Sequence, residues 1–300
     1  MREYKVKYDD SIINACRLFG IDRQVYYRKM EAKKRNGIKI EKAISMVREV
    51  RLKMPRIGTR KLYHILESQL KVLNIGRDKL FQILNANHLS ISPKRNYLIT
   101  TNTHHRFHKH KDLIQNMNIH RPEQVWVSDI TYLGSRSNHL YLSLITDAYS
   151  KKIVGFNVSD NLNTSSSVQA LEMAIKNRKY KRDELIHHSD KGIQYCSNDY
   201  QDKLMENNIK CSMTEQYDPY SNAIAERING IIKNEFLLEN YTIELELMRK
   251  IVRQSIEIYN ESRPHYSCNY LTPNQMHAQN HITIKSYKRK SRCQKSLTSA

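Results

Sequence analysis

The sequence has no paired cysteines of the kind that build a zinc module or a disulfide framework. Its five cysteines are scattered singly along the 300 residues, and none forms a pair with two residues between its members. Because both kinds of site need cysteines at close, regular spacings, we expect neither and interpret all five as reduced thiols. They are Cys16, Cys196, Cys211, Cys268 and Cys293.

Long apolar segments are also missing. No run of eighteen apolar residues occurs, and the first residues, Met1-Arg2-Glu3, are charged where a signal peptide needs an apolar stretch. A membrane-spanning helix requires about 20 predominantly apolar residues, and a secretory signal requires an apolar core. We therefore expect a soluble protein of the cytoplasm.

Acidic residues are scarce at both ends of the chain. The whole sequence has 50 Lys and Arg against 30 Asp and Glu, a formal charge of +20. Residues 1–117 hold 26 basic and 10 acidic residues, residues 118–280 hold 18 and 20, and residues 281–300 hold six and none. Charge serving only solubility is the simpler alternative. Basic ends around a near-neutral middle instead favour a nucleic-acid enzyme that collects carboxylates at one place.

Residues 1–54 are predicted to form a basic helical region with a helix-turn-helix pattern. Ser11 is a suitable cap for one short helix, Gly20 is a suitable end for it, and Asp22 starts a second short helix that reaches residue 29. Helix pairs of this size are common in proteins that do not touch DNA, so the charge carries the DNA-binding interpretation.

A second helix-turn-helix is predicted over residues 55–92. Apolar residues at helical spacing mark one helix near 62–66 and another near 80–84, joined by a turn at 74–76. The basic residues along this segment are the expected DNA contacts, namely Arg56, Arg60, Lys61, Arg77 and Lys79.

Residues 93–120 are predicted to be a linker, because they are polar and include Pro93. Four histidines lie close together there, at positions 104, 105, 108 and 110. No cysteine pair follows to complete a set of four zinc ligands, so we interpret them as solvated or facing phosphate.

The residue pattern changes at 121: residues 121–280 predict a mixed α/β core, and residues 281–300 predict a basic tail. Strands are expected at 125–133, 139–146, 152–158, 184–188 and 209–213, and helices at 165–177, 198–207, 222–238 and 243–260. Three antiparallel strands followed by alternating helices and strands are the order of a ribonuclease-H-like fold.

Three acidic residues occur where that order brings chain segments together. Asp129 lies inside the first strand, Asp190 just past the fourth, and Glu226 near the start of the helix at 222. Phosphodiester exchange uses two Mg²⁺ (or Mn²⁺) ions about 3.5–4 Å apart, and such ions prefer oxygen ligands. Lys233 lies seven residues after Glu226 on the same helix face, where it can grip an adjoining phosphate. An ordinary solvated helix face is the alternative for this helix taken alone.

The same segments resemble a known family, the insertion-sequence transposases of the IS-three type, and specifically their second reading frame (OrfB), relatives of retroviral integrases. The resemblance covers most of the chain, including Val125–Tyr132, Ile186–Tyr195, Asn222–Lys233 and Tyr259–Pro273. Between Asp190 and Glu226 there are 35 residues, the interval of the family's Asp-Asp-35-Glu signature. The loop at 217–221 departs from the family's usual Gly-Asn-x-Tyr-Asp pattern, which places that loop's contacts in doubt.

The resemblance implies a DNA transposase that nicks element ends and joins them by strand transfer. It implies that Asp129, Asp190 and Glu226 bind two ions per site and that Lys233 contacts the transposon end. The implied partners are the terminal inverted repeats and target DNA, a second copy of the chain when two ends are held, and a first-frame (OrfA) product or fusion.

Three other functions are possible alternatives: a DNA-binding regulator, a ribonuclease H and a tyrosine recombinase. A DNA-binding regulator that occupies ends without cutting needs the basic segments but not the three acids, and a plain ribonuclease H does not need two helix-turn-helix units. A tyrosine recombinase needs arginines and a histidine around its nucleophile, and no such grouping surrounds Tyr195 or the other tyrosines.

Asp147 is interpreted as a strand-end residue, and His187 and His188 as packing residues in preference to proton carriers.

Overall fold

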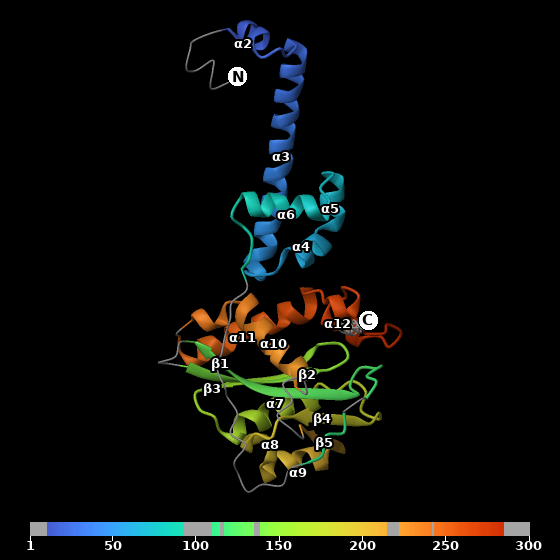
Figure 1. Cartoon of the computed structure of the whole chain (residues 1–300). Coiled ribbons are helices and arrows are strands. Elements are labelled where there is room, and N and C mark those ends of the chain that lie inside the picture. Colours follow the sequence, from blue (N-terminus) through green and yellow to red (C-terminus); the bar gives the residue numbers. More distant parts are fainter. Residues whose placement is uncertain are drawn as a thin grey trace, which may run out of the picture. The chain divides into compact units, whose positions relative to one another are not determined.

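The computed structural model describes residues 11–92, 110–114, 117–134, 139–214, 222–241 and 243–284. The chain divides into two compact units, one formed by Met1–Leu52 and Gly58–Ile91 and the other by Lys53–Ile57 and Ser92–Ala300. The first unit consists of helices in its described residues, and the second contains the sheet (Figure 1). Three of the four close histidines, at 104, 105 and 108, lie outside the described residues, as do the loop 217–221 and the tail from 285 onward.

The first unit begins with α2 (Ile12–Leu18) and α3 (Arg23–Lys53). Ser11 caps α2 by accepting the backbone N–H of Asn14, and Gly20 follows the helix with a φ of +63°. The prediction of a short second helix ending near residue 29 is wrong, because α3 continues for 31 residues. Helix-forming residues run without a proline until Pro55, so nothing stops the helix earlier. No helix in the described stretches is both long and apolar enough to cross a membrane.

Three shorter helices complete this unit, α4 (Thr59–Ile65), α5 (Glu67–Val72) and α6 (Arg77–Ala86). Leu62, Leu70 and Leu80 are fully buried, one from each helix, so the three helices enclose a small apolar core. Asn74 adopts a left-handed backbone conformation in the turn before α6. The predicted helix pair therefore exists with an additional short helix between its members.

The second unit is built on one five-stranded mixed sheet. Its strands are β1 (Val125–Gly134), β2 (His139–Asp147), β3 (Ile153–Ser159), β4 (Leu185–Ser189) and β5 (Ile209–Met213), in the order β3-β2-β1-β4-β5. The first three strands pair antiparallel, whereas β4 and β5 run parallel to β1. The predicted ribonuclease-H-like α/β core is confirmed by this topology.

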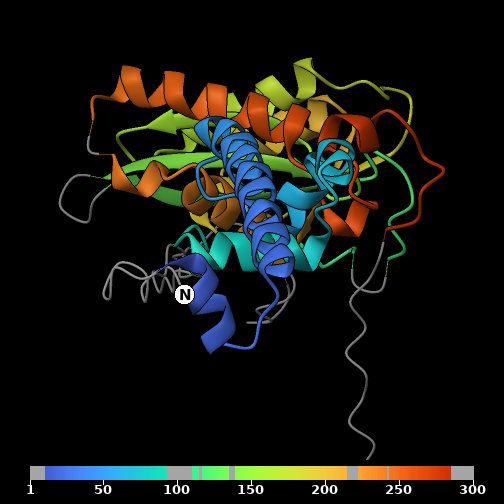
Figure 2. The same ribbon diagram turned by 90° about the horizontal axis from the view of Figure 1, so that it is seen from above.

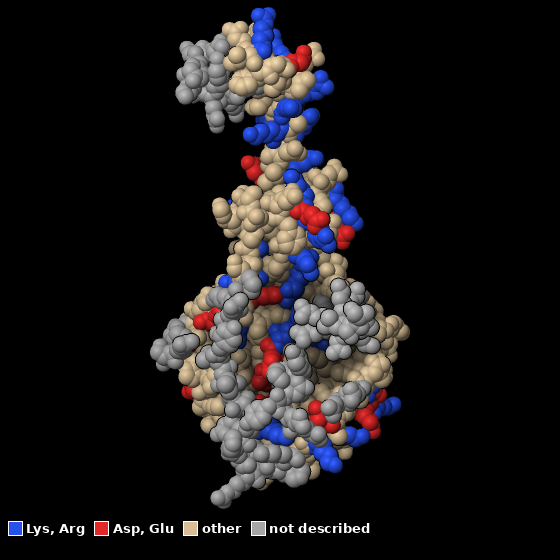
Figure 3. Space-filling model, viewed as in Figure 1, with Lys and Arg blue, Asp and Glu red and all other residues tan. Residues whose placement is uncertain are grey.

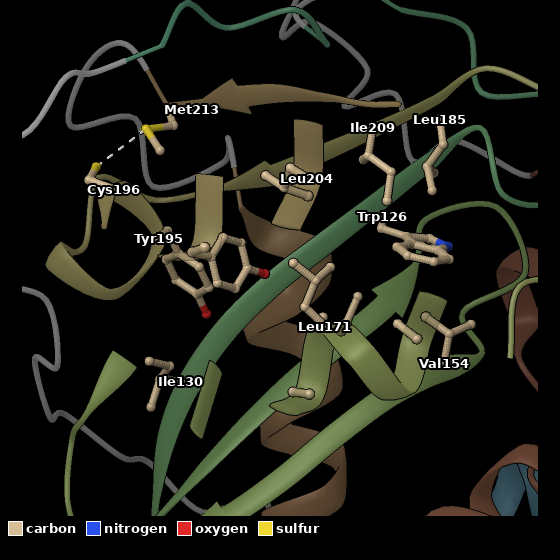
Figure 4. Packing of buried hydrophobic residues seen from close by; sticks show 14 residues of the cluster. Trp126, Ile130, Val154, Leu171, Leu185, Tyr195, Cys196, Leu204, Ile209 and Met213 are labelled. Carbon is tan, nitrogen blue, oxygen red and sulfur yellow. Dashed lines mark hydrogen bonds between the residues drawn. The ribbon is translucent and has the colours of Figure 1, made fainter. Parts of the chain in front are cut away.

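Helices cover both faces of the sheet. On one side lie α7 (Thr164–Lys176), α8 (Ile193–Cys196) and α9 (Asn198–Glu206), and on the other lie α10 (Ala223–Glu235) and α11 (Leu245–Ser262) (Figure 1). Seen from above, α11 runs along one side of the sheet (Figure 2). The larger apolar cluster lies on the α7 face and centres on Trp126 and Leu171 (Figure 4). Gly155 on β3 permits the close approach of α7, since an added Cβ would lie 2.2 Å from the Ala170 carbonyl oxygen.

Short elements lie between and after the two long helices α10 and α11 of the second unit. They are η1 (Leu238–Asn240), η2 (Tyr266–Cys268) and α12 (Pro273–His277). Thr272 begins α12 with a capping box in which its side chain accepts the backbone N–H of Gln275. These elements place His277 beneath the start of β1, where it contacts Glu123 at 3.3 Å.

A five-residue segment from the N-terminal part of the chain belongs to this second unit. Within Lys53–Ile57, Met54 and Ile57 are buried. The backbone N–H of Arg56 donates to the carbonyl oxygen of Glu235 at 2.9 Å, and its guanidinium donates to the carbonyl oxygen of Ser92 at 2.6 Å. The C-terminal end of α10 is thereby hydrogen-bonded to a segment 179 positions earlier in the sequence (235 − 56).

Candidate active site

The central acid, Asp129, lies in the middle of β1 on the face that α10 covers. Its Oδ2 accepts a hydrogen bond from Asn229 Nδ2 at 2.8 Å, and its Oδ1 accepts the backbone N–H of Ile130 at 2.9 Å. Alternation along the strand places Ile130 in the apolar cluster beneath α7, so Asp129 points to the opposite face. The side chain keeps only partial contact with solvent.

Asp190 follows the last residue of β4 and is brought beside Asp129 by strand pairing. In the parallel register Val127 is the partner of His188, and Asp129 and Asp190 each follow two residues later, close enough for the charge of Asp190 to raise the pKa of Asp129. Adjacent strands are about 4.8 Å apart. The backbone N–H of Gly192 donates to Asp190 Oδ1 at 3.0 Å, which fixes the tight turn after the strand.

Glu226 reaches the same region from the first turns of α10. Asn222, immediately before the helix, donates from Nδ2 to the backbone oxygen of Ser128 at 3.0 Å. Seven residues after Asn222, Asn229 holds Asp129, so α10 is docked on β1 on both sides of Glu226. The exposed side chain of Glu226 lies between these two anchors along the helix.

Lys233 extends the same helix face by one more turn. Its Nζ donates to Thr131 Oγ1 at 3.2 Å, two residues along β1 from Asp129. Burial lowers the pKa of Lys233, although the negative charges of Glu239 and Asp129 oppose that shift. The expectation that Glu226 and Lys233 share one helix face agrees with these contacts.

The three carboxylates act on one another electrostatically. Burial, and then the negative charge of Asp190, raises the pKa of Asp129 from 3.8 to about 7, against the opposing hydrogen bond from Asn229. Partial burial and the charge of Asp190 also raise the pKa of Glu226. Like charges held this close favour a proton or a cation among them.

The donor chemistry of this group fits divalent cations. Carboxylate oxygens are the ligands that Mg²⁺ and Mn²⁺ prefer. Among the described residues, the Oδ1 atoms of Asn222 and Asn229, which border this group, are buried without a hydrogen-bond partner. Nowhere in the described ranges do three His, Cys, Asp or Glu side chains already converge as a finished ligand set. The three carboxylates therefore interact electrostatically without forming a converged ligand set.

Asp147, His187 and His188, which the sequence also offered as candidates, are buried and hydrogen-bonded within the fold. Asp147 is fully buried at the end of β2, where it accepts the backbone N–H groups of Glu123 at 2.6 Å and Ser150 at 2.7 Å. His187 lies between Ser128 and the hydroxyl of Tyr200, at 2.6 and 2.8 Å, and burial lowers its pKa to about 3. His188 is buried and bonds to Ser212 at 2.9 Å.

The basic residues predicted to contact DNA are divided between the two units. Arg60 and Lys61 lie on α4 and Arg77 and Lys79 on α6, in the N-terminal unit, whereas Arg56 belongs to the second unit. Arg60, Arg77 and Lys79 are exposed, although Arg77 pairs with Asp78 at 2.9 Å. In the space-filling view, Lys and Arg gather along the helices of the N-terminal unit, while the second unit shows both signs of charge (Figure 3).

Two polar contributors to the site were not assigned a role from the sequence. Asn229 was given no role, and Tyr195 was considered only as a rejected nucleophile. The spacing of three residues after Glu226 was the available signal for Asn229, since it places both on one face. No sequence signal identifies the Tyr195 hydroxyl as buried and without a hydrogen-bond partner.

Comparisons with known proteins agree with this arrangement. Two family models, both described as integrase core domain, match residues 119–219 and 207–273. The transposase InsF for insertion sequence IS3A of Escherichia coli K12 is 36% identical over 160 residues, which are 53% of this chain and 55% of that protein. The insertion element IS600 uncharacterized 31 kDa protein of Shigella sonnei is 29% identical over 264 residues, 86% of this chain and 95% of that protein. The match to InsF covers about half of that protein's length.

Solved structures of viral integrases are also similar to the chain. The HTLV-2 integrase catalytic core domain, determined in complex with magnesium, is 21% identical with a TM-score of 0.41, covering 52% of this chain and 97% of that one. A chain of the simian T-cell lymphotropic virus intasome in complex with PP2A regulatory subunit B56 gamma is 18% identical with a TM-score of 0.47, covering 77% and 78%. The two integrase core models together span residues 119–273, so the chain contains an integrase core domain, and it is similar to proteins of insertion sequences, including the IS3 transposase InsF.

Proposed function

We propose that this chain is a DNA transposase that nicks DNA at the ends of an insertion sequence and joins the freed ends to another phosphodiester. One observation carries the proposal: Asp129 on β1, Asp190 in the turn after β4 and Glu226 on α10 lie close enough that the charge of Asp190 raises the pKa values of both Asp129 and Glu226. A fold that gathers like charges in this way is suited to bind cations.

The three carboxylates would hold two Mg²⁺ or Mn²⁺ ions. When bound, such a pair lowers the pKa of the attacking oxygen and stabilises the leaving oxygen. In the first step the oxygen of a water molecule bonds to phosphorus, the bond to the 3′ oxygen breaks, and that oxygen leaves as a hydroxyl. In the second step the same hydroxyl attacks another phosphodiester, and a new 3′ hydroxyl is released there. No bond between protein and DNA is needed.

The surrounding residues of the chain orient these groups. Asn229 fixes the Asp129 carboxylate through its 2.8 Å hydrogen bond. Lys233, held by Thr131 two residues from Asp129, offers a positive charge to the phosphate that follows the reacting one. Asn222 anchors the start of α10, and with it the approach of Glu226. A reaction that depends on aligned groups loses rate when any of these anchors moves.

The N-terminal unit is proposed to recognise the terminal inverted repeats. Its exposed Arg60, Arg77 and Lys79 supply charge for phosphate contacts. Lys61 and Arg56 remain proposed contacts of the same kind, and the basic residues of the tail after 284 would add sequence-independent grip. Because two ends must be held together for joining, we propose a multimer on DNA, with a first-frame (OrfA) product or fusion as a further partner.

Strand transfer on a labelled oligonucleotide duplex that carries the element's end tests this function. The full chain with Mg²⁺ or Mn²⁺ should nick the end and join it to a second duplex, whereas Asp129→Asn, Asp190→Asn and Glu226→Gln should still bind the end without cutting it. Asp202→Asn removes an exposed acid on α9 and should retain activity. A chain that binds ends but never cuts them with either ion is the regulator, and the transposase proposal then fails.

A further inference from the structure

Tyr195 lies on α8, directly after the turn that contains Asp190. Its side chain is only 3% exposed and belongs to the apolar cluster beneath the sheet (Figure 4). The ring packs edge-on against Tyr200, with centroids 5.4 Å apart, and lies 6.1 Å from the ring of His187. An aromatic ring at this position is explained by packing alone.

The hydroxyl of Tyr195 is not explained by packing. It is buried and has no hydrogen-bond partner in the part of the chain that the structure describes. The neighbouring Tyr200 provides a contrast, since its hydroxyl is paired with His187 Nε2 at 2.8 Å. A buried, unmade O–H donor destabilises a fold, and phenylalanine would fill the same volume without that cost.

Three groups act electrostatically on Tyr195, namely Asp190, Tyr200 and Asp129 in order of decreasing effect. The carboxylates of Asp190 and Asp129 both act electrostatically on Tyr195, with Asp190 acting more strongly. Gly192 separates the ring from Asp190. A Cβ built on Gly192 would lie 3.0 Å from Asp190 Oδ1 and 3.6 Å from Tyr195 Cδ2, so the carboxylate and the ring both border Gly192.

We propose that Tyr195 is a positioning residue whose hydroxyl donates a hydrogen bond to the Asp190 carboxylate when that carboxylate turns to bind a divalent cation. The inference rests on the proposed function, because it assigns Asp190 to the cation site. The donor is unpaired in the ion-free protein and becomes paired when Asp190 is drawn toward the ion. Partners of this kind, one shell outside the ligands, set ligand orientation and raise metal affinity.

Mn²⁺ binding to the full chain, followed by the electron paramagnetic resonance signal of free Mn²⁺, tests the inference without any reaction. Tyr195→Phe should raise the half-saturating Mn²⁺ concentration on the order of tenfold. The melting temperature of the same variant in EDTA should be unchanged or higher, since an unpaired donor is lost. An unchanged Mn²⁺ affinity, or a melting temperature well below that of the wild type in EDTA, would overturn the inference.

Tyr200→Phe is the matched control, because it removes a paired hydroxyl from the same cluster. It should lower the melting temperature and leave the Mn²⁺ affinity unchanged, the opposite pattern to Tyr195→Phe. Asp190→Asn should abolish the binding. If the wild type binds no Mn²⁺ that Asp190→Asn removes, the proposed function fails together with the inference, whereas equal binding by wild type and Tyr195→Phe removes the inference alone.

Discussion

Replacing Asp129 with asparagine should stabilise the protein in the absence of ions while abolishing catalysis. The pKa of Asp129 rises from 3.8 to about 7 in the fold, chiefly through burial and the charge of Asp190. A tenfold change in proton affinity corresponds to 1.36 kcal/mol, so the ionised carboxylate destabilises the folded state by about 4 kcal/mol. Asparagine has nearly the same shape, and it avoids that charge.

The pH dependence follows from the direction of this shift. Because the folded protein binds the proton more tightly than the unfolded chain does, the destabilisation is absent below pH 3.8, grows as the pH rises and is complete above pH 7. The gain in stability from Asp129→Asn should therefore be about 4 kcal/mol at pH 8 and about 2 kcal/mol at pH 5. At about 2–4 °C per kcal/mol, the variant should melt roughly 10 °C higher at pH 8.

Calorimetric melting in EDTA at both pH values, with wild type and variant side by side, measures this difference. Asp202→Asn, an exposed acid in the same unit, should show no pH-dependent gain. Equal melting temperatures of wild type and Asp129→Asn at pH 8, or a gain of the same size at both pH values, would refute the electrostatic reasoning. Mg²⁺ added to the wild type should narrow the gap, since a bound cation relieves the same repulsion.

Three further predictions concern packing, the buried acid and DNA. Gly155→Ala should lower the free energy of unfolding of the second unit by about 3 kcal/mol in urea, because the added Cβ meets the α7 backbone. Gly230→Ala, which has open space around the added Cβ, should leave the free energy of unfolding unchanged. Equal effects of the two substitutions would contradict the close approach of α7 to Gly155. Asp147→Asn should lower stability by about 3 kcal/mol but retain strand transfer per folded molecule, and complete loss in folded protein would make Asp147 a member of the site. Lys233→Ala should reduce joining more than end binding and change the slope of log K against log salt by about one or less; a larger change in slope would make Lys233 an anchor and not an aligner.

The strands of the core were predictable because each carries its own short-range signal. Alternating Leu140, Leu142 and Leu144 mark β2, and β-branched and aromatic residues mark β1, so both begin where expected. The length of α3 was not predictable from its caps, since a good start signal at Asp22 says nothing about where a helix stops. The four-residue α8 is too short to leave a periodic pattern, and its position depends on the turn after Asp190.

The candidate site was predictable to the extent that it depends on sequence spacing. Asn229 and Lys233 follow Glu226 at helical intervals, and the structure finds both in contact with β1. The pairing of Asp190 with Asp129 depends on the strand register, which only the folded sheet fixes. The unpaired hydroxyl of Tyr195 depends on the positions of every neighbouring group, so no local pattern reveals it.

The backbone hydrogen bond between Arg56 and Glu235 affects where the chain can be truncated or joined to another protein. A truncation or gene fusion after residue 91 falls at the sequence boundary between the helices and the sheet. It also removes from the second unit the buried residues Met54 and Ile57 and the backbone N–H of Arg56, which is the hydrogen-bond partner of the last carbonyl group of α10. A shortened enzyme would then show defects in catalysis that mimic a loss of DNA recognition. Chimeras that exchange the N-terminal helices between related proteins should therefore keep residues 53–57 together with the sheet unit to which they belong.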